Sequence, residues 1–240
     1  MSLAWAAGAL VIAGACFVQG LAGFGIGLVS LAFLPYLMSP AAAVVLMTVY
    51  AAVFTIAIFV PLRRDFTLDG MTELFVGTVL AAPLGVWVLA ALPADLLKRL
   101  IGLVLLTIVA LEWLGLYPRR LEGRGWGFGA GVAAGLIGGA VGTPGPPVIL
   151  YAAAQSWSAR TMKANIQAFL IVNQTVILIG YWWVGLLERE AWHLTTLYAA
   201  PAVLGLAAGM ALFSRLDRER FRRVVFAVLF VSGLVLLIGG

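Results

Sequence analysis

Two glycine-rich stretches decide the fold: "LAGFGIGLVSLAFLPYL" (21–37) and "LIGGAVGTPGPPVILYA" (136–152). They occupy equivalent positions when Gly20 is aligned with Gly139, an offset of 119 residues. Both are apolar, yet both interrupt a hydrophobic run with residues that break helices. In the second stretch, "GTPGPP" (142–147) holds three prolines and two glycines, so a continuous helix is not expected there. The chain therefore breaks its helices twice, at matching places.

The composition around these stretches is that of a polytopic membrane protein. Of 240 residues, 63% are hydrophobic and 10% are charged, and the mean hydropathy is +1.09. Several apolar runs of about 18 residues or more are long enough to cross a bilayer as helices. The runs are continuous rather than alternating, which favours helices over a barrel. The first basic residue is Arg63, so we expect no cleavable signal peptide.

Several functional classes are disfavoured. The net charge of +5 comes from Lys and Arg in short loops, as the positive-inside rule predicts, so we expect no nucleic-acid partner. One cysteine, Cys16, and one histidine, His193, argue against a disulfide, a metal or a haem, and we expect no cofactor. No Walker motif occurs, and no nucleophile–base pair suggests an enzyme.

The chain divides into two similar halves on either side of a charged segment, "YPRRLEGRGWG" (117–127). The same order of apolar blocks follows in each half, which is a stronger signal than any single identity. We assign a first transmembrane repeat to residues 1–117, a charged cytoplasmic linker to 118–125 and a second repeat to 126–240. At the 119-residue offset, four small residues coincide with four others: Gly8, Ala15, Gly20 and Gly23 with Gly127, Ala134, Gly139 and Gly142. Near the ends of the halves the offset becomes 124, where "LGVWVLAALPADLLKRL" (84–100) aligns with "AGMALFSRLDRERFRRV" (208–224).

The charges favour inverted repeats. If 3–37 and 126–157 are hairpins that return to the side they entered, 12 of the 15 Lys and Arg lie on one side; single bent crossings would give 9 against 6. The larger asymmetry fits the positive-inside rule. We therefore expect an all-α fold of two inverted repeats, each a broken or re-entrant hairpin followed by three transmembrane helices. We expect the protein in the cytoplasmic (inner) membrane, as a multi-pass protein. Both of its termini would lie outside the cytoplasm. Whether the hairpins cross fully, and whether the chain forms a homodimer, is left open.

Two explanations compete for the glycines. Gly127, Gly131, Gly135 and Gly139 are spaced for close helix packing, which we expect of them. The prolines that follow need another explanation, because broken backbone at membrane depth is tolerated only beside protein or a water-filled cavity. Paired breaks in two repeats point to a binding site at the bilayer midplane, and exposed N–H groups there favour an anion.

The candidate substrate-binding residues lie in the breaks and on the helix after each break. Gln167 and Gln174 share one face of the stretch 164–186, and Thr48 and Thr55 are their equivalents in the first half. Each side chain is equally explained by a helix cap or by a hydrogen bond between helices. The candidates are Gln19, Gly23, Gly25, Gly27, Ser30, Thr48, Gly142, Thr143, Gly145, Asn165, Gln167, Asn173 and Gln174.

The two stretches resemble the TauE/SafE sulfite exporter family, also called the four-toluene sulfonate uptake permeases. The residues that carry the resemblance are "QGLAGFGIGLVSLAFLPYL" (19–37), "GLIGGAVGTPGPPVILY" (135–151) and the two repeat ends, 82–106 and 204–230. The resemblance spans nearly the whole chain and implies transport of sulfur-containing anions such as sulfite or sulfonates. It does not imply which anion, in which direction or with which coupling ion.

We therefore expect a secondary transporter that moves small sulfur-containing anions by alternating access, in contact with the lipid bilayer. An anion channel, or a carrier of small carboxylates or other anions on the same fold, is the alternative. A channel would show conductance and weak saturation, whereas a carrier should saturate.

Overall fold

The computed structural model describes residues 3–115, 124–212 and 218–239, and these are helical with no strand. The expected linker at 118–125 falls mostly outside them. The first half contains α1 (Leu3–Ala22), α2 (Ile26–Leu31), α3 (Pro40–Phe59), α4 (Thr72–Ala91) and α5 (Ala94–Trp113), with short 3₁₀ turns η1 (Leu34–Tyr36) and η2 (Val60–Asp65). The second half contains α6 (Arg124–Val141), α7 (Gly145–Ala153), α8 (Ala159–Trp183), α9 (Arg189–Leu197), α10 (Ala199–Leu212) and α11 (Arg218–Gly239).

Helix boundaries in the two halves coincide at the offsets seen in the sequence. At 119 residues, the last residue of α1 matches that of α6, and the first residues of α2 and α3 match those of α7 and α8. At 124 residues, the first residue of α5 corresponds to Arg218, the first described residue of α11. Even a cap is duplicated, because Ser39 accepts a hydrogen bond from the third residue after it at the start of α3, and Ser158 does the same for α8. The local structure thus repeats where the sequence repeats.

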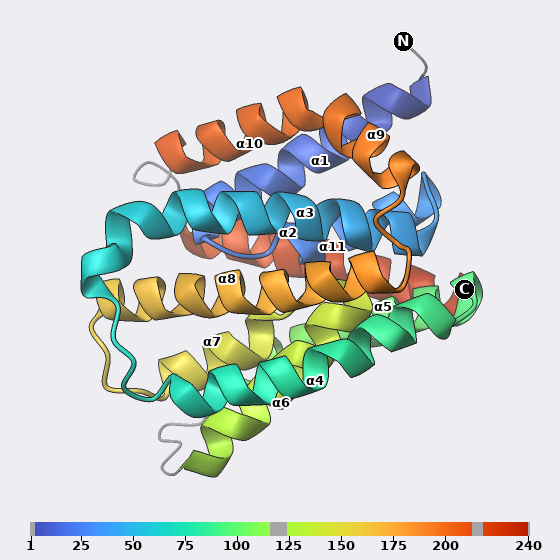
Figure 1. Ribbon diagram of the computed structural model, residues 1–240. Helices are drawn as coiled ribbons and strands as arrows, with labels where there is room; N and C mark the ends of the chain where they lie inside the picture. The colour runs from blue at the N-terminus through green and yellow to red at the C-terminus, as the bar shows by residue number, and fades with distance from the viewer. Residues whose placement is uncertain (1–2, 116–123, 213–217, 240) are drawn as a thin grey trace.

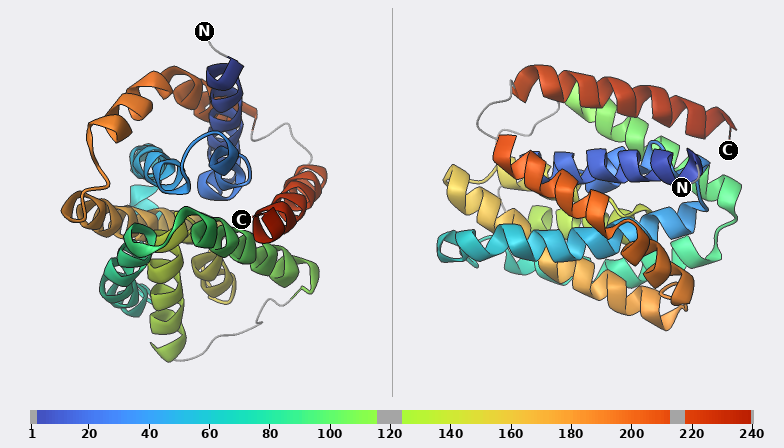
Figure 2. Two further views of the ribbon diagram at one scale, coloured as in Figure 1. Left: turned by 90° about the vertical axis from the view of Figure 1, so that its right-hand side faces the viewer. Right: turned by 90° about the horizontal axis from the view of Figure 1, so that it is seen from above.

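The two halves interlock rather than stand apart. Helix α4 of the first half lies along α6 of the second, and α10 of the second lies along α1 of the first (Figure 1). The central helices α3 and α8 pack on each other (Figure 1), and α5 runs beside α11 at one edge (Figure 2, right). Each helix of these four pairs thus contacts a helix of the other half.

Glycines make these contacts close. A Cβ at Gly131, Gly135 or Gly139 of α6 would meet the backbone of α4, and one at Gly205 or Gly209 of α10 would meet the backbone of α1. The predicted packing role is therefore confirmed for three of the four glycines of α6. The fourth, Gly127, packs against side chains instead of backbone, since a Cβ there would lie 3.2 Å from the Tyr151 hydroxyl and 3.4 Å from the Cβ of Glu73 in α4.

Within the described residues, four helical segments are long and apolar enough to cross a bilayer: α1, α3 with η2, α4 and α8. A fifth is formed if α9 and α10, bent by 52°, are one span. By hydrophobicity alone residues 194–214 form one apolar block, whereas the structure bends within it. It has a local cause: Pro201 has no N–H to donate to the carbonyl of Leu197, where α9 ends. Some indole rings are largely exposed at the helix ends, including those of Trp113, Trp126, Trp182 and Trp183, as expected of a membrane–water interface.

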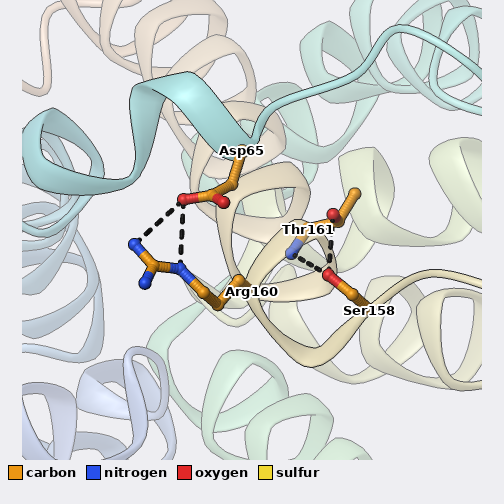
Figure 3. Close-up of polar contacts among 4 residues, drawn as sticks. All are labelled: Asp65, Ser158, Arg160 and Thr161. Carbon is orange, nitrogen blue, oxygen red and sulfur yellow. Dashed lines mark hydrogen bonds and ion pairs between the residues drawn. The ribbon is translucent and has the colours of Figure 1, made fainter.

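The loops collect at two ends of the molecule. The connections 60–71 and 154–158 lie at the left of Figure 1, while 92–93, 184–188 and both ends of the described chain lie to the right. At the left end Arg160 pairs with Asp65, at 3.2 and 3.3 Å, so η2 of the first half is tied to α8 of the second (Figure 3). Figure 3 also shows the Ser158 cap beside this pair. Arg124 and Glu73, 3.1 Å apart, link the starts of α6 and α4 in the same way.

Candidate functional site

The first feature of the site is a pair of breaks in the chain. Between α1 and α2, Gly23 and Gly25 adopt left-handed backbone angles, with φ of +83° and +102°. Between α6 and α7, Gly142 does the same, with φ of +67°, at the position equivalent to Gly23. Side chains are strained at such angles, so glycine is needed where each helix stops. Both predicted interruptions are present.

The two breaks lie against each other. A Cβ on Gly27, in the first turn of α2, would lie against the carbonyl oxygen of Gly142 and 2.8 Å from the methyl carbon of Thr143. The second half therefore touches the first where both helices are interrupted, and only a residue without a side chain permits this approach.

A pocket opens at this junction, with an empty volume of about 350 Å³ including its open mouth. Its walls come from both breaks and from α3 and α8. The residues that line it are Gln19, Phe24, Gly25, Ile26, Gly27, Leu28, Ala51, Thr55, Gly142, Thr143, Pro144, Gly145, Pro146, Leu170 and Gln174. None of these described lining residues carries a formal charge.

Three side chains in the pocket have polar atoms without a hydrogen-bond partner. They are the hydroxyl oxygens of Thr55 and Thr143 and the amide oxygen of Gln174, whose residues are 0, 4 and 3% exposed. Leaving such an atom unpaired costs about 1–3 kcal/mol. Buried polar atoms in natural proteins nearly always have partners, so three unpaired ones around one cavity indicate a place for a ligand or water.

Other buried hydroxyls donate to a carbonyl of their own helix, as the hydroxyls of Thr55 and Thr143 do not. Ser30 donates to the Ile26 carbonyl at 2.6 Å, and Thr48 donates to the Val44 carbonyl at 2.8 Å. Such bonds to the preceding turn are the usual solution for a hydroxyl on a helix. Thr55 also lies on a helix but makes no such bond. Its hydroxyl therefore remains available to the pocket.

The first break is held in place by two glutamines. The Gln167 amide of α8 donates to the Gly23 carbonyl at 2.8 Å. Gln19 bridges the break, since its amide donates to the same carbonyl at 3.4 Å and its oxygen accepts from the Ile26 N–H at 3.4 Å. Gln19 thus occupies the first N–H group of α2.

The two helix starts differ in what they offer to an anion. The first bond inside α2 runs from the Val29 N–H to the Gly25 carbonyl, so the N–H groups of Gly27 and Leu28, both in the lining, lie before it. In the first turn of α7, Pro146 and Pro147 have no N–H, and of the described lining residues in that turn Gly145 alone has one. The expected grip by backbone donors therefore falls mainly to the first half.

Seven of the predicted site residues line the pocket: Gln19, Gly25, Gly27, Gly142, Thr143, Gly145 and Gln174. Gly23 and Gln167 are not in the lining, but the Gln167 amide donates to the Gly23 carbonyl. The remaining four lie outside the lining. Ser30 and Thr48 are bonded within their own helices, Asn165 accepts from the Thr67 N–H at 3.1 Å, and Asn173 donates to the Thr78 hydroxyl at 2.6 Å.

The candidates from sequence lacked Thr55, whose hydroxyl is one of the three unpaired groups. The sequence identifies Thr55 as the equivalent of Gln174 at the 119-residue offset, but this alone did not place it among the candidates. The two residues lie on packed helices and line the same pocket. The other lining residues that were missed, such as Phe24 and Leu170, are apolar, and no chemical pattern marks them.

Comparison with known proteins identifies the chain's family. A family model described as "Sulfite exporter TauE/SafE" matches residues 7–236. No curated protein and no solved structure gives a significant match.

Proposed function

The chain belongs to the sulfite exporter TauE/SafE family, and we propose that it moves small sulfur-containing anions, such as sulfite or organosulfonates, by alternating access. Membership makes it a multi-pass membrane transporter rather than an enzyme, and the apolar helices agree. The proposal concerns the finer points: the substrate, its site, the mechanism and the orientation in the cytoplasmic membrane.

One observation carries the proposed site. The unpaired groups of Thr55, Thr143 and Gln174 surround a pocket at the point where the two broken helices meet. Two hydroxyls and the N–H groups of Gly27 and Leu28 are neutral donors of the kind that bind an oxyanion. Breaks at the interface of two repeats are where secondary transporters bind their substrates.

The mechanism we propose is movement of one inverted repeat against the other around this pocket. The matching helix boundaries and the exchange of partners between halves support such a duplication. Helices α3 and α8, equivalent in the two halves, both contribute to the pocket, so a shift between them would change its access. This is the expected behaviour of a site that opens first to one side and then to the other.

The proposed orientation places the end with 60–71 and 154–158 in the cytoplasm. Arg63, Arg64, Arg124 and Arg160 lie in the helices and turns of that end. The positive-inside rule assigns such an end to the cytoplasm, and both termini would then lie on the opposite side.

The test is uptake by the purified full chain in liposomes. Radiolabelled sulfite and a small sulfonate should enter saturably and faster when the same anion is preloaded inside. Conductance without saturation would favour an anion channel, and uptake of acetate-sized carboxylates instead would favour a different anion carrier. Failure of sulfite, thiosulfate and sulfonates either to move or to raise the melting temperature would reject the proposed substrate class.

A further inference from the structure

The charge inventory of the pocket restricts the form of the substrate. Among the described lining residues there is no Lys, Arg, His, Asp or Glu. A nearby cation, Lys163, lies outside the lining, with its Cε 3.6 Å from where a Cβ of Gly23 would be. The cost of moving an ion from water into a less polar site grows with the square of its charge, so a dianion is penalised about four times as much as a monoanion. Sites for doubly charged oxyanions usually offset this cost with Arg, Lys or a metal.

We infer that the pocket selects monoanions, and that near neutral pH it takes hydrogensulfite, HSO₃⁻, rather than the sulfite dianion, SO₃²⁻. This inference rests on the proposed function, because it concerns the charge state of the substrate in the same pocket. Sulfite exists as both forms near neutrality, so a single transported compound tests the distinction. Methanesulfonate is a monoanion, and thiosulfate a dianion, over the whole useful pH range.

The hydrogen-bonding groups agree with the charge argument. The hydroxyls of Thr55 and Thr143 can donate to the oxygens of an anion, whereas the amide oxygen of Gln174 can only accept. A ligand that matches all three has negative oxygens and one O–H group, as O-protonated hydrogensulfite does. The inference rests on the absence of Lys, Arg and His among the described lining residues. The Gln174 oxygen is a second argument, and it holds for the amide orientation in the structure.

The experiment is uptake by liposomes containing the full chain, with equal pH inside and outside, over a pH series that spans the second ionisation of sulfurous acid. The passive flux of sulfur dioxide into protein-free liposomes is subtracted. At fixed total sulfite, below saturation, we expect the rate to fall about tenfold for each pH unit above that ionisation. The rate for methanesulfonate should stay within about twofold, which excludes titration of the protein as the cause. Thiosulfate should be transported far more slowly than methanesulfonate.

The outcomes separate the inference from the function. Sulfite uptake that is constant or rises with pH, or thiosulfate uptake as fast as that of methanesulfonate, overturns the monoanion inference and leaves the transport function standing. No uptake and no thermal stabilisation by any of the three rejects both. The variant Lys163→Gln should keep the same pH slope, and a flattened slope would show that Lys163, not the pocket, sets the selectivity. The variant Gln174→Lys adds a cation to the pocket. We expect it to transport thiosulfate faster, relative to methanesulfonate, than the parent protein does.

Discussion

The two breaks occupy equivalent positions but differ in their backbone angles and in the hydrogen bonds of their polar groups. The first, at Gly23–Gly25, contains two left-handed glycines and is held by the amides of Gln19 and Gln167. The second, at 142–144, contains one left-handed glycine, is followed by a proline-rich helix start and leaves the Thr143 hydroxyl unpaired. The equivalent of Thr143 in the first break is Phe24.

This difference shows that breaks at equivalent positions need not carry the same chemistry. Fixed angles at Gly23 and Gly142 end both helices in the same way, so the architecture is shared. At the first break the Gly23 carbonyl and the Ile26 N–H are bonded to glutamine side chains, and Gly27 and Leu28 supply backbone donors. At the second break, Pro146 and Pro147 have no N–H, and Thr143 supplies a hydroxyl. We therefore expect the bonded side chains at the first break to contribute mainly to stability, and the unpaired groups of Thr55, Thr143 and Gln174 mainly to anion binding.

The largest effect is expected where the two breaks touch. Gly27→Ala adds a Cβ against the Gly142 carbonyl, which is backbone and cannot move aside cheaply. We expect a loss of about 1–3 kcal/mol of stability, or more, because overpacking at a backbone contact forces the two halves apart. Transport should be abolished. The measurements are the melting temperature in detergent and sulfite uptake in liposomes.

The matched control is Gly145→Ala at the start of α7. Its Cβ would have ordinary contacts of 3.7 Å with Ile149 and Phe24, and its backbone is not left-handed. Its melting temperature should stay close to that of the parent protein. Equal destabilisation by both alanines would show that the contact at Gly27 has no special role.

The next comparison uses two glutamines seven residues apart on α8. Gln167→Leu removes the hydrogen bond to the Gly23 carbonyl and leaves that buried oxygen with only the weaker bond from Gln19, at a cost of about 1–3 kcal/mol. Gln174→Leu removes a side chain whose oxygen has no partner, so it should cost little stability while raising KM for the anion. Melting temperature and KM are measured for both. A loss of stability in Gln174→Leu as large as that in Gln167→Leu would contradict this division between bonded and unpaired side chains.

Removing the unpaired hydroxyls of the pocket is expected to change stability by less, and to raise it. Thr55→Val and Thr143→Val remove unpaired buried oxygens and should raise stability by about 1 kcal/mol each, while lowering the affinity for the anion about tenfold. Thr48→Val is the control, since its hydroxyl is bonded to Val44; it should lose about 0.5–1.5 kcal/mol and keep its affinity. Ligand titrations and melting curves on the same three proteins decide the matter. Weaker binding in Thr48→Val than in Thr55→Val would reverse the assignment.

The sequence carried the architecture further than the site. The glycines at an offset of 119 residues predicted both helix ends, because a left-handed backbone angle requires glycine at that position in the sequence. No residue type in the sequence indicates that the Thr55 hydroxyl is unpaired. On a helix Thr48 and Thr55 look alike, and only the packing of α3 against α8 decides which of them bonds to its own backbone and which faces the pocket. The bend before Pro201 does have a local sequence signal, the proline, but the hydrophobicity of the surrounding block does not reveal it.

The smallest effect is expected at the ion pair between Arg160 and Asp65, which joins the two halves at one end only. Their equivalents at the 119-residue offset are Ala41 and Val184, so the opposite end has no counterpart. The Arg160 side chain is 74% exposed and that of Asp65 is 30% exposed, and such pairs contribute about 0.2–1 kcal/mol. A double-mutant cycle with Arg160→Ala and Asp65→Ala, followed by melting temperature at low and high salt, should give a coupling in that range that shrinks with salt. A coupling above about 2 kcal/mol would mean that this end, and not the contact of the breaks, holds the halves together.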